Sequence, residues 1–280
     1  MISKIEKLYT SSKNFIELAK ISEKYAKPVE QYFNKCLPSY QLHNFTFVRT
    51  YNNSSRSIIT LRPFLALKFY QNKLHLNDAM MDLNHYHPIY FRRDTMDDNV
   101  LNKFNLLNNH TKYYEPVVLE FKFNSFKDSL CFNISNKDRK INLLSILPPL
   151  YLLSISFYKR YVPSLDRRLP IFPIKSEKNI NLFDYKNLNV FNQLKDEFSL
   201  TNKEIDYAQL LTLGLNTEQL SYTLNNSKRT VEKHIISLRS KFNIDKKQDL
   251  ENYLATLYIS HASEFVSSQL NPYSVIKTAK

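Results

Sequence analysis

Residues 198–257 read FSLTNKEIDYAQLLTLGLNTEQLSYTLNNSKRTVEKHIISLRSKFNIDKKQDLENYLATL, and their pattern decides the fold of the C-terminal part of the chain. Thr201 and Glu204 have the spacing of a capping box, in which the threonine hydroxyl accepts from the glutamate amide and the glutamate reaches back to the threonine amide. We therefore expect a helix to begin after Thr201. It should end at Gly214, the only glycine in the sequence, because glycine readily adopts the left-handed conformation found just past a helix end.

Two further caps follow at the spacing of a helix-turn-helix unit. Asn216 and Gln219 repeat the capping box, and Ser227 caps the helix after it. In that third helix the apolar residues recur at helical spacing, so one stripe packs inward and the opposite face stays in solvent. The inward stripe is Val231, Ile235, Leu238 and Phe242, and the outward residues are Lys228, Arg229, Glu232, Lys233 and Ser237.

A fourth amphipathic segment carries Leu250, Leu254 and Leu257 on one side. A helix with a single apolar face needs a partner to cover it. We expect these three leucines to form a dimer contact between two copies of the chain.

These residues resemble the four-helix DNA-binding domain of LuxR-type bacterial transcriptional regulators. The resemblance covers about sixty residues and implies a third helix that enters the major groove of DNA and a fourth helix that supports dimers. It also implies that Thr217 and Thr230 contact phosphate and that Lys228, Arg229 and Lys233 reach bases or phosphates. The matching residues are Leu200, Thr201, Glu204, Gly214, Ser227, Thr230, Val231, Glu232, Lys233, His234, Leu238, Lys241 and Phe242. The predicted DNA-contacting set is Thr217, Ser227, Lys228, Arg229, Thr230, Glu232, Lys233, His234, Ser237 and Lys241.

The distribution of charge agrees with a polyanionic partner. The chain has 39 Lys and Arg against 26 Asp and Glu, a net charge of +13, which favours DNA but equally an anionic membrane surface. Between Lys228 and Lys247 seven basic residues stand against two acidic ones. The excess positive charge therefore falls on the predicted recognition helix and its neighbour.

The first 160 residues predict a separate α+β domain. Residues 45–51 and 57–61 form one expected β-hairpin, residues 117–123 and 129–134 a second, and Pro63 begins a helix through about Tyr70. An antiparallel sheet with packed helices follows, and such a domain can enclose a small-molecule pocket. The resemblance to LuxR-type quorum-sensing regulators does not extend to the tryptophans that hold lactones in that family, since this chain has none.

The expected domain limits are 1–160 for the α+β sensor-like domain, 161–197 for a linker with a short helix, 198–258 for the all-α helix-turn-helix domain and 259–280 for a tail. Residues 141–158 are uncharged, but Pro148 and Pro149 lie in their middle, so we expect a helix against the sheet. The alternative is a membrane-anchored receptor in which this segment spans the bilayer. An N-terminus interrupted by charge predicts no secretory signal.

No cofactor, metal site or catalytic group is predicted. Cys36 and Cys131 lack neighbouring ligands, and His85 and His87 have no third ligand close in sequence. The function predicted is that of a cytoplasmic, nucleoid-associated transcriptional regulator and not of an enzyme. Its partners would be double-stranded DNA and a second copy of the chain, and the identity of any small-molecule ligand stays open.

Overall fold

The computed structural model describes residues 12–53, 55–83, 85–96, 98–107, 114–136, 141–165, 172–173 and 190–270. Its internal contacts divide the chain into two compact units. The first comprises Met1–Tyr86, Phe91–Ile141 and Ser164–Asp184, and the second comprises His87–Tyr90, Asn142–Pro163 and Tyr185–Lys280.

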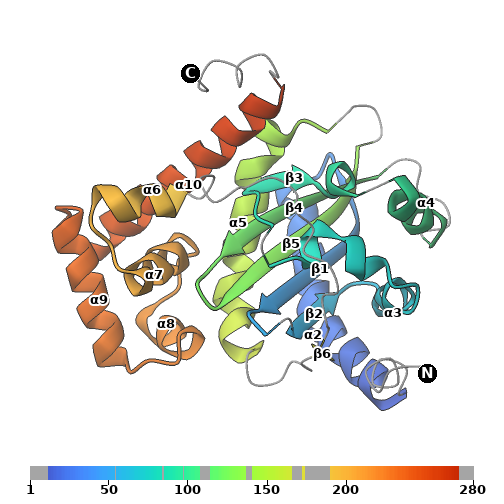
Figure 1. The fold of residues 1–280 in the computed structure, drawn as a ribbon, viewed down its shortest axis with the longest axis horizontal. Helices are drawn as coiled ribbons and strands as arrows, with labels where there is room; N and C mark the ends of the chain where they lie inside the picture. Colours follow the sequence, from blue (N-terminus) through green and yellow to red (C-terminus); the bar gives the residue numbers. More distant parts are fainter. Residues whose placement is uncertain are drawn as a thin grey trace. The chain divides into compact units, whose positions relative to one another are not determined.

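The sheet has six strands in the order β3–β4–β5–β1–β2–β6 (Figure 1). Both predicted hairpins are confirmed: β1 pairs antiparallel with β2, and β4 with β5. β1 also pairs antiparallel with β5, which joins the two hairpins at the centre of the sheet. The strands are β1 (Gln41–Tyr51), β2 (Ser55–Thr60), β3 (Ile89–Phe91), β4 (Glu115–Lys122), β5 (Phe126–Ser135) and β6 (Phe172–Pro173).

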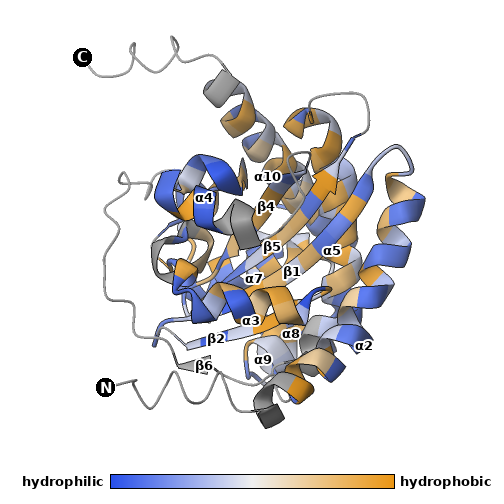
Figure 2. Ribbon diagram, turned by 90° about the vertical axis from the view of Figure 1, so that its right-hand side faces the viewer, coloured by the Kyte–Doolittle hydropathy of each residue, from blue (hydrophilic) through white to orange (hydrophobic). Residues whose placement is uncertain are grey.

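Helices pack on this sheet, as an α+β domain requires. The longest is α2, which contacts β1 and β2 and continues through Pro28, while α3 begins at Pro63 as predicted. Figure 2 shows hydrophobic residues along β4 and β5, with hydrophilic ones interleaved. The helical elements are α2 (Ser12–Cys36), α3 (Pro63–Gln71), α4 (Asp98–Leu107) and the 3-10 turns η1 (Leu74–Asn77), η2 (Ala79–Met81) and η3 (Arg92–Thr95).

The two faces of the sheet differ in chemistry although both are buried. Residues alternate between faces along a strand, and directly opposed residues of neighbouring strands share a face. One face is largely apolar, and the buried charges of Arg49 and Asp128 on it form an ion pair. The opposite face is polar. By strand register the apolar face carries Phe45, Phe47, Arg49, Ile59, Asp128, Leu130 and Phe132, and the polar face carries Thr46, Thr50, Arg56, Thr60, Glu120, Lys127 and Ser129.

In the described part of the second unit, the regular secondary structure is helical apart from the short segment 87–90. Within it α10 packs on α7, α6 and α9, α8 packs on α9, and α6 packs on α7. The predicted four-helix C-terminal domain is confirmed, with α6 as the short connecting helix before it. The helices are α5 (Leu143–Leu165), α6 (Val190–Glu197), α7 (Asn202–Thr212), α8 (Thr217–Thr223), α9 (Lys228–Lys241) and α10 (Lys247–Leu270).

The uncharged segment near residue 150 forms one helix, α5, which continues through both prolines into residues predicted as linker. Its packing against the sheet stays a prediction, because residues 142–163 group with the helical unit. Among the residues that the structure describes, no helix combines the length and the apolar character needed to cross a bilayer. The rest of the predicted linker lies outside the described residues, except for 172–173 and α6.

α10 continues to Leu270, beyond the limit of 258 expected for the C-terminal domain. The proposed division of the chain at 160, 197 and 258 stays a prediction.

Candidate nucleic-acid interface

Three local caps define the starts of α7, α8 and α9. The Thr201 amide donates to Glu204 Oε2 over 2.8 Å, and the Glu204 amide donates to Thr201 Oγ1 over 3.2 Å. Asn216 and Gln219 form the same reciprocal pair, with both bonds at 2.9 Å. The Thr230 amide donates to Ser227 Oγ over 3.1 Å. Each cap stabilises its helix by about 1 kcal/mol, so the starts of the three helices are set locally.

The turns between these helices depend on left-handed residues. Gly214 (φ 66°) follows α7, Asn225 (φ 51°) follows α8, and Asn243 (φ 52°) follows α9. Gly214 is also crowded, because a Cβ built on it would lie 2.5 Å from Cε of Lys159 in α5. The left-handed conformation therefore favours glycine at this turn, while the crowding atoms belong to the flexible end of Lys159.

The inward face of α9 fixes how the helix is rotated. Val231, Ile235 and Leu238 are buried, as the spacing predicts. His234 stacks on the Tyr207 ring of α7, with ring centroids 4.5 Å apart. Burial lowers the pKa of His234, so the imidazole is uncharged at neutral pH. His234 thus belongs to the helix-packing surface.

Glu204 joins α7 to α9 by a second polar contact. Its carboxylate accepts from Ser237 Oγ over 2.6 Å and from Lys241 Nζ over 2.9 Å. Lys241 Nζ also donates to the Ser199 carbonyl over 2.8 Å. Glu204 and Lys241 therefore form an ion pair between α7 and α9.

The Glu204 side chain is 5% exposed, so its charge depends on these partners. Burial acts to raise the pKa of the carboxyl, but hydrogen bonds from Lys241, Ser237 and Thr201 outweigh it and lower the pKa to about 2. The carboxylate is therefore ionised throughout the neutral range. Ser237 and Lys241, both predicted to contact DNA, have internal partners that hold α9 on α7.

The outward face of α9 carries the remaining predicted side chains. Lys228, Arg229, Glu232 and Lys233 are exposed. Lys228 Nζ lies 3.1 Å from Glu218 Oε1 of α8, and both side chains are more than half exposed, so this ion pair exchanges readily with solvent or with another anion. The structure brings these four side chains together over the first two turns of the helix.

Sequence reasoning missed Ile236, which is 60% exposed on the same face. It lies three residues after Lys233 and seven after Arg229, the spacing of one helical face. The signal in the sequence was the pair Ile235–Ile236, of which only one member can point inward. An exposed isoleucine next to two cations adds an apolar group to a charged surface.

Hydroxyl groups flank this surface at the helix starts. Thr217 is the first residue of α8 and is half-buried, while Ser227 and Thr230 share a hydrogen bond of 2.8 Å between their hydroxyls. Ser227 is exposed, and its oxygen is engaged in the cap.

Comparison with known proteins identifies this region. Residues 198–254 match the family model described as GerE, bacterial regulatory proteins of the luxR family. Residues 198–254 are a LuxR-family domain. Comparison with curated protein sequences gives no match.

Two solved structures are similar to the chain as a whole. SdiA in complex with octanoyl-rac-glycerol shares 13% identity with a TM-score of 0.34, covering 86% of this chain and 88% of that one. Escherichia coli SdiA in the space group P6522 shares 15% identity with a TM-score of 0.35, covering 88% and 92%. These likenesses are too distant to carry over a ligand or an oligomeric state.

The LuxR-family domain buries two of the three leucines predicted to form a dimer contact. Leu250 and Leu254 are completely buried within the single chain, where α10 packs on α7, α6 and α9. A side chain already covered by its own domain cannot also cover a second copy, so the predicted role of these two residues is corrected to that of core residues. Leu257 is half-buried, and its dimer role stays a prediction.

No cluster of three or more His, Cys, Asp or Glu capable of holding a metal ion occurs among the described residues. His87 packs edge-to-face with Tyr90, with ring centroids 5.5 Å apart.

Proposed function

We propose that the protein is a sequence-specific DNA-binding regulator of transcription that acts on chromosomal DNA in the cytoplasm. The observation that carries this proposal is the outward face of α9, where Arg229, Lys233 and Ile236 share one exposed stripe. A helix of this kind fits the major groove, which is about 12 Å wide. The family match of residues 198–254 supports the same function.

The side chains of the outward face divide by their chemistry. Arg229 and Lys233 donate hydrogen bonds to guanine or phosphate, and the Ile236 side chain packs against the methyl group of thymine. Lys228, Thr217 and Thr230 lie at helix starts, where side chains and amides approach phosphates. Ser227 caps α9 in the same region. Glu232, beside Lys233, would help to discriminate between base pairs, because a carboxylate accepts a hydrogen bond from cytosine and is repelled by phosphate.

His234, Ser237 and Lys241 support binding indirectly in this proposal. Their partners are Tyr207 and Glu204 of α7, so they orient α9 rather than reach the DNA. Their substitution should therefore reduce stability before it changes sequence preference.

The protein acts as a dimer in this proposal. One recognition helix reads only a few base pairs, and two copies on half-sites about 34–36 Å apart read a longer, two-fold symmetric site. The partly exposed surface of α10 around half-buried Leu257, just past the matched residues 198–254, is available for this contact.

Helix α5 is the element through which the first unit would control DNA binding. It directly follows the sheet in sequence, yet it contacts the LuxR-family domain: Tyr151 Oη donates to the Thr212 carbonyl over 2.6 Å, and the Gln219 side chain donates to the Lys159 carbonyl. The two bonds involve the last residue of α7 and the first turn of α8, on either side of Gly214. A shift of α5 would therefore move the helix-turn-helix directly.

The test is recovery of genomic DNA bound by the full chain, followed by gel-shift measurements on the enriched sequence. We expect the bound DNA to share one two-fold symmetric sequence motif. The double variant Arg229→Ala, Lys233→Ala should no longer enrich this motif. Lys103→Ala, an exposed lysine of α4, removes a charge elsewhere and should keep the motif. Recovery of no shared sequence by the native protein would make the four helices a protein-interaction module instead.

A further inference from the structure

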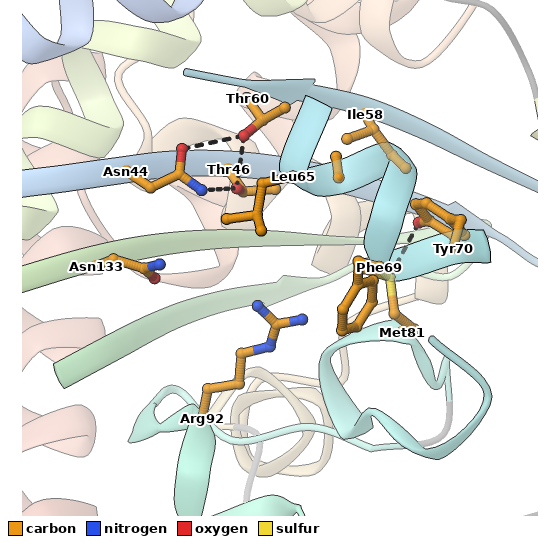
Figure 3. A pocket seen from close by; sticks show the side chains of 11 residues that line it. Asn44, Thr46, Ile58, Thr60, Leu65, Phe69, Tyr70, Met81, Arg92 and Asn133 are labelled. Atoms are coloured by element: carbon orange, nitrogen blue, oxygen red, sulfur yellow. Dashed lines mark hydrogen bonds between the residues drawn. The ribbon is translucent and has the colours of Figure 1, made fainter. Parts of the chain in front are cut away.

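A small cavity lies between the polar face of the sheet and α3. Its volume is about 40 Å³. By the same measure one water needs about 10–15 Å³, so the cavity has room for about three waters. Figure 3 shows α3 residues such as Leu65 and Phe69 on one side and the Asn44–Thr60 hydrogen bonds on another. The lining is Asn44, Thr46, Ile58, Thr60, Leu65, Ala66, Phe69, Tyr70, Met81, Arg92 and Asn133.

Arg56 on β2 is not part of the cavity lining, but it is tied to residues that are. It shares a face with Ile58, two residues further along the strand, and its Nη2 donates to the carbonyl of Met81 over 2.6 Å. Both of those residues line the cavity. Arg56 is thus hydrogen-bonded to the wall of the cavity at Met81.

The charge of Arg56 is buried and lacks a counterion in the described part of the chain. The residue is 4% exposed, and its Nε and Nη1 have no hydrogen-bond partner there. Thr50, the residue directly opposite in β1, also has a buried hydroxyl oxygen without a partner. Buried polar atoms are almost always hydrogen-bonded, so two adjacent unpartnered groups beside a cavity indicate a missing acceptor.

The neighbouring charged groups do not neutralise Arg56. The charges of Asp78 and Arg56 both act on His75 and Tyr70, but Asp78 accepts hydrogen bonds from Arg92. His75 stays neutral, because burial and the charge of Arg56 lower its pKa to about 4. Two guanidiniums and one carboxylate leave this region with one positive charge in excess, which a bound anion would neutralise.

The other buried cations of the unit show the contrast. Arg49 donates to both oxygens of Asp128 over 2.7 Å, and Lys127 Nζ lies 2.8 Å from Glu120 Oε1. Each of these cations has its own carboxylate. We propose that the cavity and Arg56 together bind a small organic carboxylate, with the carboxyl group on Arg56 and Thr50 and a short hydrocarbon part against Leu65, Ala66 and Phe69.

This ligand class follows from size, charge and lining. A short carboxylate matches a volume of about three waters. The hydrocarbon side of α3 disfavours a purely inorganic anion, and Asn44, Thr46 and Thr60 already bond to one another. That the carboxylate acts as a signal rests on the proposed function, whereas its binding does not.

Calorimetric titration of the full chain with sodium butyrate tests the site. We expect a Kd in the range of about 0.1–1 mM for so small a ligand. Butyramide has nearly the same shape without the charge, and it should bind at least about tenfold more weakly. Equal binding of the two compounds, tighter binding of inorganic phosphate, or no binding of butyrate would each overturn the proposal.

Arg56→Met is the decisive variant, with Arg93→Gln, an exposed arginine, as its control. Arg56→Met should weaken butyrate binding at least about tenfold and, without ligand, leave the melting temperature unchanged or raised, because an uncompensated buried charge is removed. Arg93→Gln should leave the affinity for butyrate unchanged. A folded Arg56→Met protein with native butyrate affinity would refute the site.

Gel-shift assays with and without butyrate separate this proposal from the proposed function. A protein that binds butyrate but no specific DNA refutes the DNA-binding function and leaves the anion site standing. Specific DNA binding without any butyrate binding does the reverse.

Discussion

Glu204 in the helical unit and Arg56 beside the sheet are both ionised and nearly buried, but only one is neutralised. Glu204 has a cation and two further donors from its own domain. Arg56 has one carbonyl and two nitrogens without acceptors among the described residues. The comparison shows that a buried charge can either hold a fold together or leave a place for another molecule, and that the count of its partners separates the two cases.

Glu204→Gln should give the largest effect on this comparison. The substitution keeps the shape of the side chain but removes the charge that Lys241 and Ser237 bind, so the free energy of unfolding should fall by about 2–3 kcal/mol. Urea unfolding of the full chain measures the loss. The control is Glu232→Gln, which changes an exposed glutamate one helix turn away from Arg229. It should lower the free energy of unfolding by less than about 0.5 kcal/mol. Equal losses in the two variants would show that Glu204 is not a structural charge.

Acid titration tests the same residue without a mutation. The folded pKa of Glu204, about 2, lies below its ordinary value of 4.5, so the unfolded chain binds the proton first. The stability contributed by Glu204 is complete above pH 4.5 and is lost as pH falls toward 2. The native protein should therefore lose more stability across this window than Glu204→Gln does, and parallel curves for the two proteins would contradict the assignment.

Arg229→Ala and Lys241→Ala should separate the groups that bind DNA from those that support the helix. Arg229→Ala should weaken specific binding by about 1–3 kcal/mol if it contacts a base. Lys241→Ala should leave the dependence of binding on salt unchanged, because its ammonium is held by Glu204 and Ser199. A salt slope lower by about one unit for Lys241→Ala would return this lysine to the phosphate contacts.

Gly214→Ala should cost about 1–2 kcal/mol of stability through the left-handed backbone alone. The nearest atoms to the new methyl group belong to the flexible end of Lys159, which can move aside. Thermal unfolding measures the change, and Lys159→Ala combined with Gly214→Ala should recover only a small part of it. Full recovery would assign the cost to crowding instead of conformation.

Glu218→Gln should have the smallest effect. Its partner Lys228 is exposed, so loss of the pair should change stability by about 0–1 kcal/mol. Removal of this competing carboxylate should leave DNA affinity unchanged or raise it, measured by the same gel-shift assay. A large loss of stability would mean that this exposed pair is a main contact between α8 and α9.

Much of the helical unit could be predicted because its decisive interactions are local. Thr201 and Glu204, Asn216 and Gln219, and Ser227 and Thr230 each lie three residues apart, so residue type and spacing suffice. The left-handed conformation of Gly214 at the turn after α7 could be predicted in the same way. The two hairpins could be predicted for the same reason. The alternation of apolar and polar residues along a strand, and the turn residues between two strands, are signals that span only a few positions.

The misses came from interactions between distant parts of the sequence. The one-sided pattern of α10 showed that Leu250 and Leu254 would be covered, but the pattern is the same whether the cover is a second copy or their own domain. Arg49 and Asp128 are 79 positions apart, and only the strand register brings them together. Ile236 was overlooked because only polar side chains were expected on the outward face, which left this apolar residue unassigned.

The turns after α8 and α9 have a further consequence. Asn225 and Asn243 adopt left-handed conformations that glycine adopts without strain, in a chain that uses glycine once. Asparagine tolerates this region better than most residues but less well than glycine. Glycine at these two solvent-exposed positions should therefore raise the thermal stability of the domain. The substitutions would change neither the core nor the outward face of α9.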